Sequence, residues 1–368
     1  MNPNIIETIN ITRAAAWQPW AVQYFFLIGT SLTAVFLTLP AFLMGKQSYT
    51  KIGRLGLLTA VSCGIAGVVA LLADLHQPGR FWHFYTDFTA WSWMSWGSFL
   101  LPVFLIALVL YAWAVYRPDL GRMAEQPGTI LAPLYKALAF GDKPEGWLVR
   151  PLAVVTVLAA CSIALYTGME VMVIKARPLW HTPFLPLMYL FTGMVGSTGV
   201  CLLLNRIIGD GDRDAERGLN RFLLVALGLM MLNGALWFGS GWAGVSAPAQ
   251  RALASMSGNK EWITVAVWAG LSAIVPFVIA WFKPVGSGVI TGLIAVHSAW
   301  MFRWTIFING QMLPKTGSGV YPYHFPLGSE GLLGVVGTFG LWVLIIVVLI
   351  TFLPWDGRIA TPDRAASR

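Results

Sequence analysis

Residues 331–353 read GLLGVVGTFGLWVLIIVVLITFL, a run of 23 residues without one charged side chain. A helix of about 20 apolar residues is long enough to cross the roughly 30 Å hydrocarbon core of a membrane. Eight earlier runs have a similar length and character, and each is predicted to be a membrane-spanning helix. These predicted spans are residues 20–44, 55–75, 95–116, 151–174, 183–204, 222–242, 261–281 and 287–309.

The composition agrees with a membrane protein. Hydrophobic residues make up 57% of the chain and charged residues 11%, whereas an average soluble domain has roughly 25% charged residues. The runs are apolar all round and do not alternate as barrel strands do, which favours helices. We therefore predict an all-α, polytopic helix bundle that forms one domain over residues 1–368, with an eight-helix core, a ninth helix near 331–353 and a tail at 354–368.

The net charge of +8 could indicate a nucleic-acid surface, but the basic residues are scattered among the segments that join the apolar runs. We interpret them as topology signals and expect membrane lipid, not nucleic acid, around the protein. Sixteen Lys and Arg residues fall on the side of the C-terminus and eight at most on the other side. The N-terminus is therefore predicted to be periplasmic and the C-terminus cytoplasmic, in a bacterial inner membrane. The connections 117–150 and 205–221 are expected to be solvated cytoplasmic loops, and GDGD at 209–212 marks a turn.

Metal-binding patterns are not evident. The three cysteines stand alone inside apolar runs, and only His297 of the five histidines lies well inside a span. A membrane cytochrome b needs paired axial histidines on facing helices, so we expect no haem, iron-sulfur cluster or other metal in this protein. His297 fits a packing residue or a quinone contact better than a metal ligand.

Ionisable residues gather at the span edges on the side of the N-terminus. Asp74, His76, Arg80 and His83 follow the second span, Glu170 and Arg177 lie near the end of the fourth, and Arg303 is on the eighth. Charges at membrane depth are costly and normally face a cavity or a partner, so each is a site candidate. The alternative is that Asp74 with Arg80, and Glu170 with Arg177, are structural straps between helices. Most of the 18 tryptophans lie on the same side, as an interfacial belt alone or as a belt that also docks a partner.

Two stretches resemble a known family. Residues 73–85, ADLHQPGRFWHFY, followed by WSWMSWG at 91–97, are similar to the signature of NrfD-like membrane subunits, the polysulfide-reductase membrane-subunit family. His76 and Gln77 stand where the wider family commonly has Gly-Arg before the proline, which favours its tetrathionate-reductase branch. Supporting stretches are WAVQYFF at 20–26, YTGME at 166–170, ARPLW at 176–180, MFRWT at 301–305 and GTFGLW at 337–342.

The resemblance implies a membrane anchor that oxidises menaquinol or ubiquinol. It also implies two partners: a periplasmic, ferredoxin-like iron-sulfur subunit that takes the electrons, and a molybdopterin catalytic subunit that uses them, with tetrathionate as the expected terminal acceptor. The segment 311–330 is a candidate for docking the iron-sulfur subunit.

A quinol site needs proton acceptors and groups that orient the ring. We expect Asp74, His76, His83 and Glu170 to accept protons, and Arg80 and Arg177 to keep the carboxylates ionised. The remaining expected quinol contacts are Trp20, Gln23, Tyr24, Tyr166 and Arg303.

Other functions stay open from the sequence. A sulfur-compound dehydrogenase that reduces quinone, or a polysulfide or thiosulfate reductase anchor, would have a similar subunit. A secondary transporter could use Asp74, Glu170 and Arg303 to bind an ion, although transporters usually place such charges near the midplane on broken helices.

Overall fold

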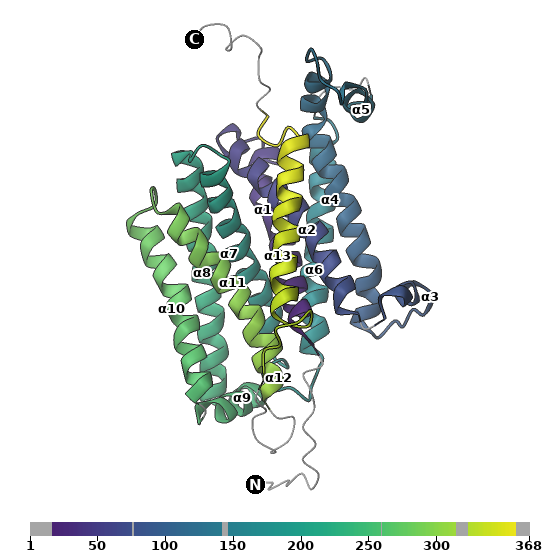
Figure 1. Ribbon diagram of the computed structural model, residues 1–368. Helices are drawn as coiled ribbons and strands as arrows, with labels where there is room; N and C mark the ends of the chain where they lie inside the picture. Colours follow the sequence, from purple (N-terminus) through teal and green to yellow (C-terminus); the bar gives the residue numbers. More distant parts are fainter. Residues whose placement is uncertain (1–16, 76, 142–145, 259, 314–322, 358–368) are drawn as a thin grey trace.

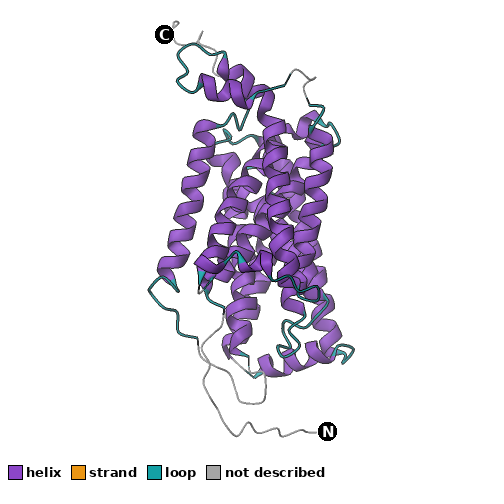
Figure 2. Ribbon diagram, turned by 90° about the vertical axis from the view of Figure 1, so that its right-hand side faces the viewer, coloured by secondary structure: helices purple, strands orange, loops and turns teal. Residues whose placement is uncertain are grey.

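The computed structural model describes residues 17–75, 77–141, 146–258, 260–313 and 323–357. Nine helices in these ranges are long and apolar enough to cross a membrane, which confirms the predicted all-α bundle. They are α1 (Pro19–Phe42), α2 (Thr50–Asp74), α4 (Trp93–Ala124), α6 (Val149–Met172), α7 (Phe184–Ile207), α8 (Arg213–Trp242), α10 (Lys260–Phe282), α11 (Gly288–Trp304) and α13 (Leu332–Phe352). Figures 1 and 2 show the long helices running side by side, with the two ends of the chain at opposite ends of the bundle.

Shorter elements cover both ends of the bundle. They are η1 (Gln47–Tyr49), η2 (Pro78–Arg80), α3 (His83–Thr86), α5 (Ala132–Leu138), α9 (Ala247–Ser257), the π-helical turn η3 (Thr305–Asn309) and α12 (Gly310–Met312). The last two extend α11 without a break in the chain. We call the end where α1 begins the N-terminal face, and the end where α13 finishes the C-terminal face.

The helices form two neighbouring groups of four, joined through α1 and α7. One group contains α1, α2, α4 and α6, the other contains α7, α8, α10 and α11, and α13 packs against α2 (Figure 1). Small residues allow the central helices to approach closely. A methyl group on Gly193 of α7 would lie 2.8 Å from the carbonyl oxygen of Gly29 in α1. The crossing of α1 with α7 therefore requires glycine at this position.

The predicted loops differ in part from the structure. The helix expected to end at residue 116 continues to Ala124, and α5 follows inside the segment expected to be a solvated loop. The connection expected over 205–221 is short, because α7 runs to Ile207 and α8 begins at Arg213. Polar residues extend these helices beyond the apolar run, which hydropathy alone does not reveal.

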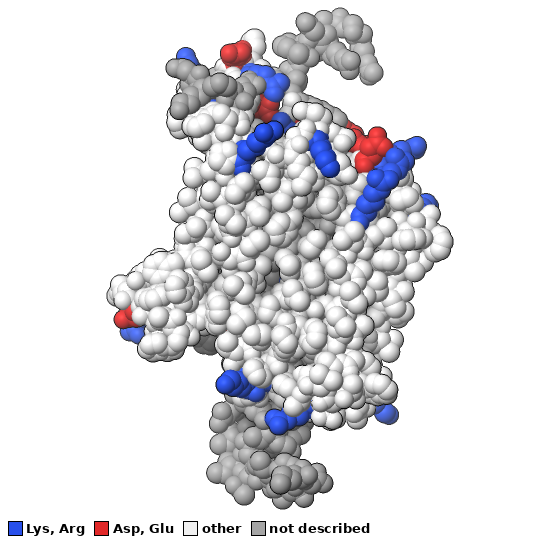
Figure 3. Space-filling model, turned by 180° about the vertical axis from the view of Figure 1, so that it is seen from behind, with Lys and Arg blue, Asp and Glu red and all other residues white. Residues whose placement is uncertain are grey.

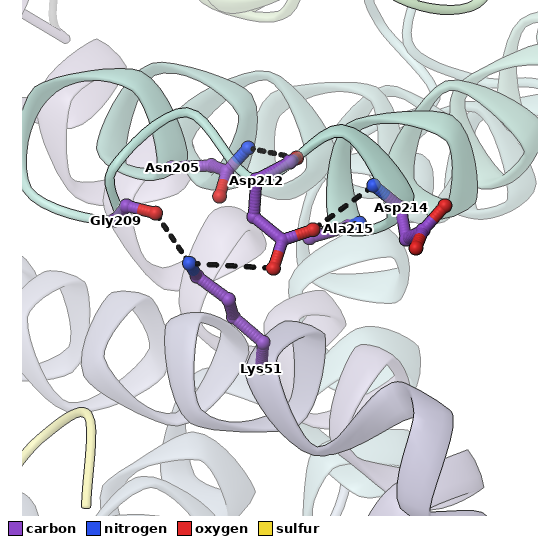
Figure 4. Close-up of polar contacts among 6 residues, drawn as sticks. All are labelled: Lys51, Asn205, Gly209, Asp212, Asp214 and Ala215. Carbon is purple, nitrogen blue, oxygen red and sulfur yellow. Dashed lines mark hydrogen bonds and ion pairs between the residues drawn. The ribbon is translucent and has the colours of Figure 1, made fainter. Parts of the chain in front are cut away.

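The turn at 209–212 is confirmed, and its polar contacts explain why it is a turn (Figure 4). The Asp212 carboxylate accepts N–H bonds from Asp214 and Ala215, both at 2.9 Å, and so caps the start of α8. The ammonium of Lys51 donates to the Gly209 carbonyl and lies 3.5 Å from Asp212. The Ala215 N–H, aided by Lys51, holds the pKa of Asp212 below its usual range. The cap therefore stays ionised at neutral pH and would be lost only as the pH falls through that lowered value.

Charged side chains gather at the two ends of the molecule, and the middle of the face in Figure 3 is free of them. The best-buried charge at the C-terminal face is Asp119 on α4, whose carboxylate lies 2.7 Å from the guanidinium of Arg54 on α2 and also pairs with Arg122. Arg54 in turn donates to the Pro354 carbonyl just after α13, at 3.1 Å. These contacts bind α2, α4 and the end of α13 together.

Asp119→Asn is expected to lower the free energy of unfolding by about 3 kcal/mol, because it leaves the largely buried Arg54 without its counter-charge. The midpoint of thermal unfolding in one detergent measures the effect. Asp214→Asn is the matched control, because the Asp214–Arg217 pair is exposed and exposed pairs contribute about 0–1 kcal/mol. Equal midpoints for the two variants would show that the Asp119 contacts do not stabilise the bundle.

Candidate functional site

A buried polar group lies near the N-terminal face, where α1, α2 and α6 meet. Tyr166 and Glu170 stand one turn apart on α6, so their side chains share one face of the helix. Tyr24 of α1 lies beside Tyr166, and Asp74 at the end of α2 is close enough to interact electrostatically with Glu170. The structure thus brings together four of the residues expected from the sequence. We call Tyr24, Asp74, Tyr166 and Glu170 the Glu170 group.

One oxygen in this group is unusual. The Oε2 atom of Glu170 is buried and has no hydrogen-bond partner among the described residues. Buried carboxylate oxygens are normally satisfied, because an unpaired one costs the full desolvation of the group. A free oxygen here is suited to accept a proton or a hydrogen bond from a bound molecule.

The position of the Tyr166 ring depends on Gly97, near the start of α4. A methyl group on Gly97 would lie 2.1 Å from Cζ of Tyr166 and 2.6 Å from its hydroxyl oxygen. Only glycine therefore lets α4 approach the ring. The glycine that ends the WSWMSWG stretch is a packing requirement of the Glu170 group.

Tyr189 on α7 extends the polar group, although the sequence did not indicate it. Its hydroxyl is buried without a hydrogen-bond partner among the described residues, and it interacts electrostatically with both Glu170 and Arg303. Tyr189 is the sixth residue of α7, as Tyr24 is the sixth of α1. A lone tyrosine near the start of an apolar run was the one available signal.

Arg303 is the largest fully buried side chain of the described residues, with 1% of its surface exposed. Its guanidinium donates to the Tyr189 carbonyl at 2.8 Å, to the Thr192 hydroxyl and to the Phe25 carbonyl at 3.4 Å, and it lies 4.5 Å from the centre of the Tyr189 ring. No carboxylate of a described residue lies within 4.0 Å of it. Arg303 therefore joins α11 to α1 and α7 through protein acceptors and holds Tyr189 in place.

Trp20 and Gln23 lie on a different side of α1 from that expected for a ring-binding pair. The Gln23 amide donates to the Val335 carbonyl at 3.0 Å and accepts from the indole of Trp300 at 2.8 Å. The Trp20 ring packs against Gly334. These contacts join α1 to α11 and α13.

Arg177 lies in the connection between α6 and α7. It donates to the carbonyls of Gln311 and Leu313, both at 2.8 Å, and stacks 5.5 Å from the centre of the Trp180 ring. These contacts tie the α6–α7 connection to the end of α11. The structure thus gives Arg177 a strap-like role, with backbone carbonyls as its acceptors.

Arg80 and His83 lie apart from the Glu170 group, although they are close to Asp74 in the sequence. Both are exposed on η2 and α3, which project sideways from the bundle beside α4 (Figure 1). The His83 imidazole lies 3.6 Å from the Asp87 carboxylate. The two residues line a separate cavity of about 480 Å³, whose wall begins at Leu75. His76, predicted as a proton acceptor, lies outside the described residues.

His297 stands on the outside of α11 and accepts a hydrogen bond from the indole of Trp268 at 3.0 Å. The described residues contain no group of three or more His, Cys, Asp or Glu side chains that could hold a metal ion. The groups at the N-terminal face can therefore exchange protons and hydrogen bonds with a bound molecule.

Comparisons with known proteins agree with this picture. The model of the family described as polysulphide reductase, NrfD, matches residues 7–315. The protein is 31% identical to the C subunit of tetrathionate reductase from Salmonella typhimurium, over 94% of both sequences. It is also 29% identical to the third component, C, of polysulfide reductase from Wolinella succinogenes over 50% of this sequence and 57% of that one. The C subunit of selenate reductase from Mesobacillus selenatarsenatis is 22% identical over 60% and 56%. A match of this extent, on a bundle of membrane-spanning helices, shows that the protein belongs to the NrfD family of membrane subunits of reductase complexes.

Proposed function

We propose that this protein is the quinol-oxidising membrane anchor of a periplasm-facing oxidoreductase complex, and that the complex reduces tetrathionate. The observation that carries the proposal is the buried, unpartnered oxygen of Glu170, next to Tyr24 and Tyr166. A lipid-soluble quinol carries two hydroxyl groups and can enter a membrane bundle from the side. The similarity to a tetrathionate reductase subunit over almost the whole sequence supports the terminal acceptor.

In this proposal the quinol loses two electrons and two protons and becomes the quinone. Glu170 accepts a proton at Oε2, and the phenol of Tyr166 orients the adjacent hydroxyl. Asp74, at the end of α2, receives protons from Glu170 and passes them to water at the N-terminal face. Arg303 acts indirectly, by holding Tyr189 against the Glu170 group.

The electrons leave to partner subunits. We propose an iron-sulfur subunit at the N-terminal face and a molybdopterin catalytic subunit beyond it, as the resemblance to reductase anchors suggests. The excess of Lys and Arg at the C-terminal face supports a cytoplasmic C-terminus and a periplasmic N-terminal face. Protons and electrons then leave on the same side, so quinol oxidation itself moves little charge across the membrane.

The proposal is tested on the complex purified through a tag on this protein. Quinol-dependent reduction of tetrathionate, together with iron and molybdenum in the copurified partners, is the expected result. A tagged protein that purifies with iron-sulfur and molybdenum subunits but passes no electrons from quinol would contradict the quinol role. Transport of an ion by the protein alone in vesicles would favour the transporter.

Gly97→Ala is expected to slow quinol oxidation about tenfold, because the added methyl group displaces the Tyr166 ring that orients the substrate. Steady-state quinol oxidation by the purified complex measures the effect. Gly121→Ala, on the same helix near the other face, is the control, since the nearest atom to its added methyl group is 3.7 Å away. Equal rates for Gly97→Ala and the wild type would remove Tyr166 from the proposed mechanism.

A further inference from the structure

A second large cavity lies in the other group of four helices, away from the Glu170 group. Its volume is about 940 Å³, and α7, α8, α10 and α11 form its walls, with α9 at one end. The lining covers the parts of these helices that are nearest the N-terminal face, Met230–Trp242 of α8 and Trp262–Ile274 of α10. Cavities of roughly 300–1,000 Å³ commonly hold small organic ligands.

The chemistry of the lining restricts the ligand. The described residues that line the cavity include many apolar side chains, among them four tryptophans and five methionines, and no Asp, Glu, Lys, Arg or His. Phospholipid headgroups carry a phosphate, which basic pockets recognise. An uncharged cavity inside membrane-spanning helices therefore fits an uncharged, lipid-soluble molecule.

The few polar groups suggest what part of the ligand they would meet. Ser272 of α10 donates to Ser298 of α11 at 3.2 Å, and both side chains line the cavity and are largely buried. Hydroxyl groups of this kind can donate to a ring carbonyl. Tryptophan and methionine walls favour contact with a flat unsaturated ring. These features match a quinone headgroup with an isoprenoid tail.

We propose that this cavity binds an uncharged isoprenoid quinone or quinol from the membrane pool, at a site separate from the Glu170 group. The inference rests on the proposed function in one respect, because quinol oxidation makes the quinone pool the relevant source. No carboxylate or imidazole among the described residues lines the cavity, so it has no base to take a proton from a quinol. It is a holding site, not a second reaction site.

The position of the cavity supports this role. Phe302 and Ile306 of α11 form part of its wall, and the next residue after Phe302 is Arg303. The ring of Phe302 lies 6.4 Å from that of Tyr189, which in turn interacts with Glu170. The holding site and the Glu170 group thus lie on either side of Tyr189 and Arg303.

Photolabelling of the purified complex in phospholipid nanodiscs tests the proposal. The probe is a benzoquinone with a diazirine on its tail, and the labelled peptides are mapped by mass spectrometry. Gly270→Trp fills the cavity, because Gly270 lines it and an added Cβ there meets no atom within 4 Å. Gly340→Trp on α13 is the matched control, because its added Cβ also meets nothing within 4 Å but it does not line the cavity.

We expect labels on peptides of α8, α10 or α11 and, separately, on peptides of α1 or α6. Gly270→Trp should abolish the first set and retain the second, while Gly340→Trp retains both. If Gly270→Trp fails to fold, Gly234→Phe fills the cavity from α8, where only the end of the flexible Met188 side chain lies within 4 Å of the added Cβ.

The remaining outcomes separate the two proposals. Labels around the Glu170 group alone would overturn the second site and leave the proposed function standing. Labels at neither place would overturn both. Labelling of α8, α10 or α11 that persists in both filling variants would overturn the assignment to this cavity. A phospholipid with a diazirine acyl chain that labels these peptides, while the quinone probe does not, would identify an ordinary lipid site and overturn the proposal.

Discussion

Glu170→Gln is expected to slow quinol oxidation by about a hundredfold while the complex still assembles. The amide has nearly the same shape as the carboxylate and can accept a hydrogen bond, but it cannot take up the proton that leaves the quinol. The buried Oε2 atom without a protein partner is the acceptor that this change removes. Steady-state oxidation of a soluble quinol by the purified complex, followed by absorbance, measures the loss.

Glu261→Gln provides the control for this variant. Glu261 is also a carboxylate near the N-terminal face, in the first turn of α10, and lies outside the Glu170 group. It should oxidise quinol at the wild-type rate. A Glu170→Gln complex with wild-type turnover would reduce Glu170 to a structural residue and remove the central step of the mechanism.

Arg303→Met is expected to lower the free energy of unfolding by about 3 kcal/mol or more, because it strands buried acceptors that the guanidinium now satisfies. The carbonyl of Tyr189 and the hydroxyl of Thr192 lose their donor, and α11 loses a link to α7. The midpoint of thermal unfolding and the yield of assembled complex measure the change. Arg251→Met on α9 is the matched control, because Arg251 is exposed.

Arg303 also distinguishes two roles. If it is a strap, Arg303→Met lowers the unfolding midpoint, and any loss of turnover accompanies that loss of stability. Unchanged stability with a raised KM for quinol would instead make Arg303 a direct substrate contact, as the sequence first suggested. That result would contradict the role that its hydrogen bonds give it here.

The spans could be predicted because a membrane demands about 20 apolar residues from each crossing helix, and that demand is visible in the sequence. The ends of the helices could not. The helix α4 continues through Arg117, Asp119 and Arg122 to Ala124, since Arg54 of α2 pairs with Asp119 and keeps this polar segment against the bundle. The 11-residue α9 lies outside the apolar runs, so hydropathy gives no sign of it.

The site could be predicted where residues share one helix face. Tyr166 and Glu170 are four residues apart, so a helix alone places them together. Arg80 and His83 follow Asp74 closely in the sequence, but the backbone turns away at η2 and carries both to an exposed projection. The role of Tyr189 depends on contacts between α6, α7 and α11, and such contacts cannot be derived from one helix at a time.

The most direct test of the account is an experimental density map of the whole complex with a quinol-site inhibitor bound. We predict the inhibitor headgroup within hydrogen-bond distance of Glu170 and Tyr166, near the N-terminal face, with the nearest iron-sulfur cluster held by a partner subunit on that side. A headgroup bound near the C-terminal face, or a haem inside this protein, would contradict the account.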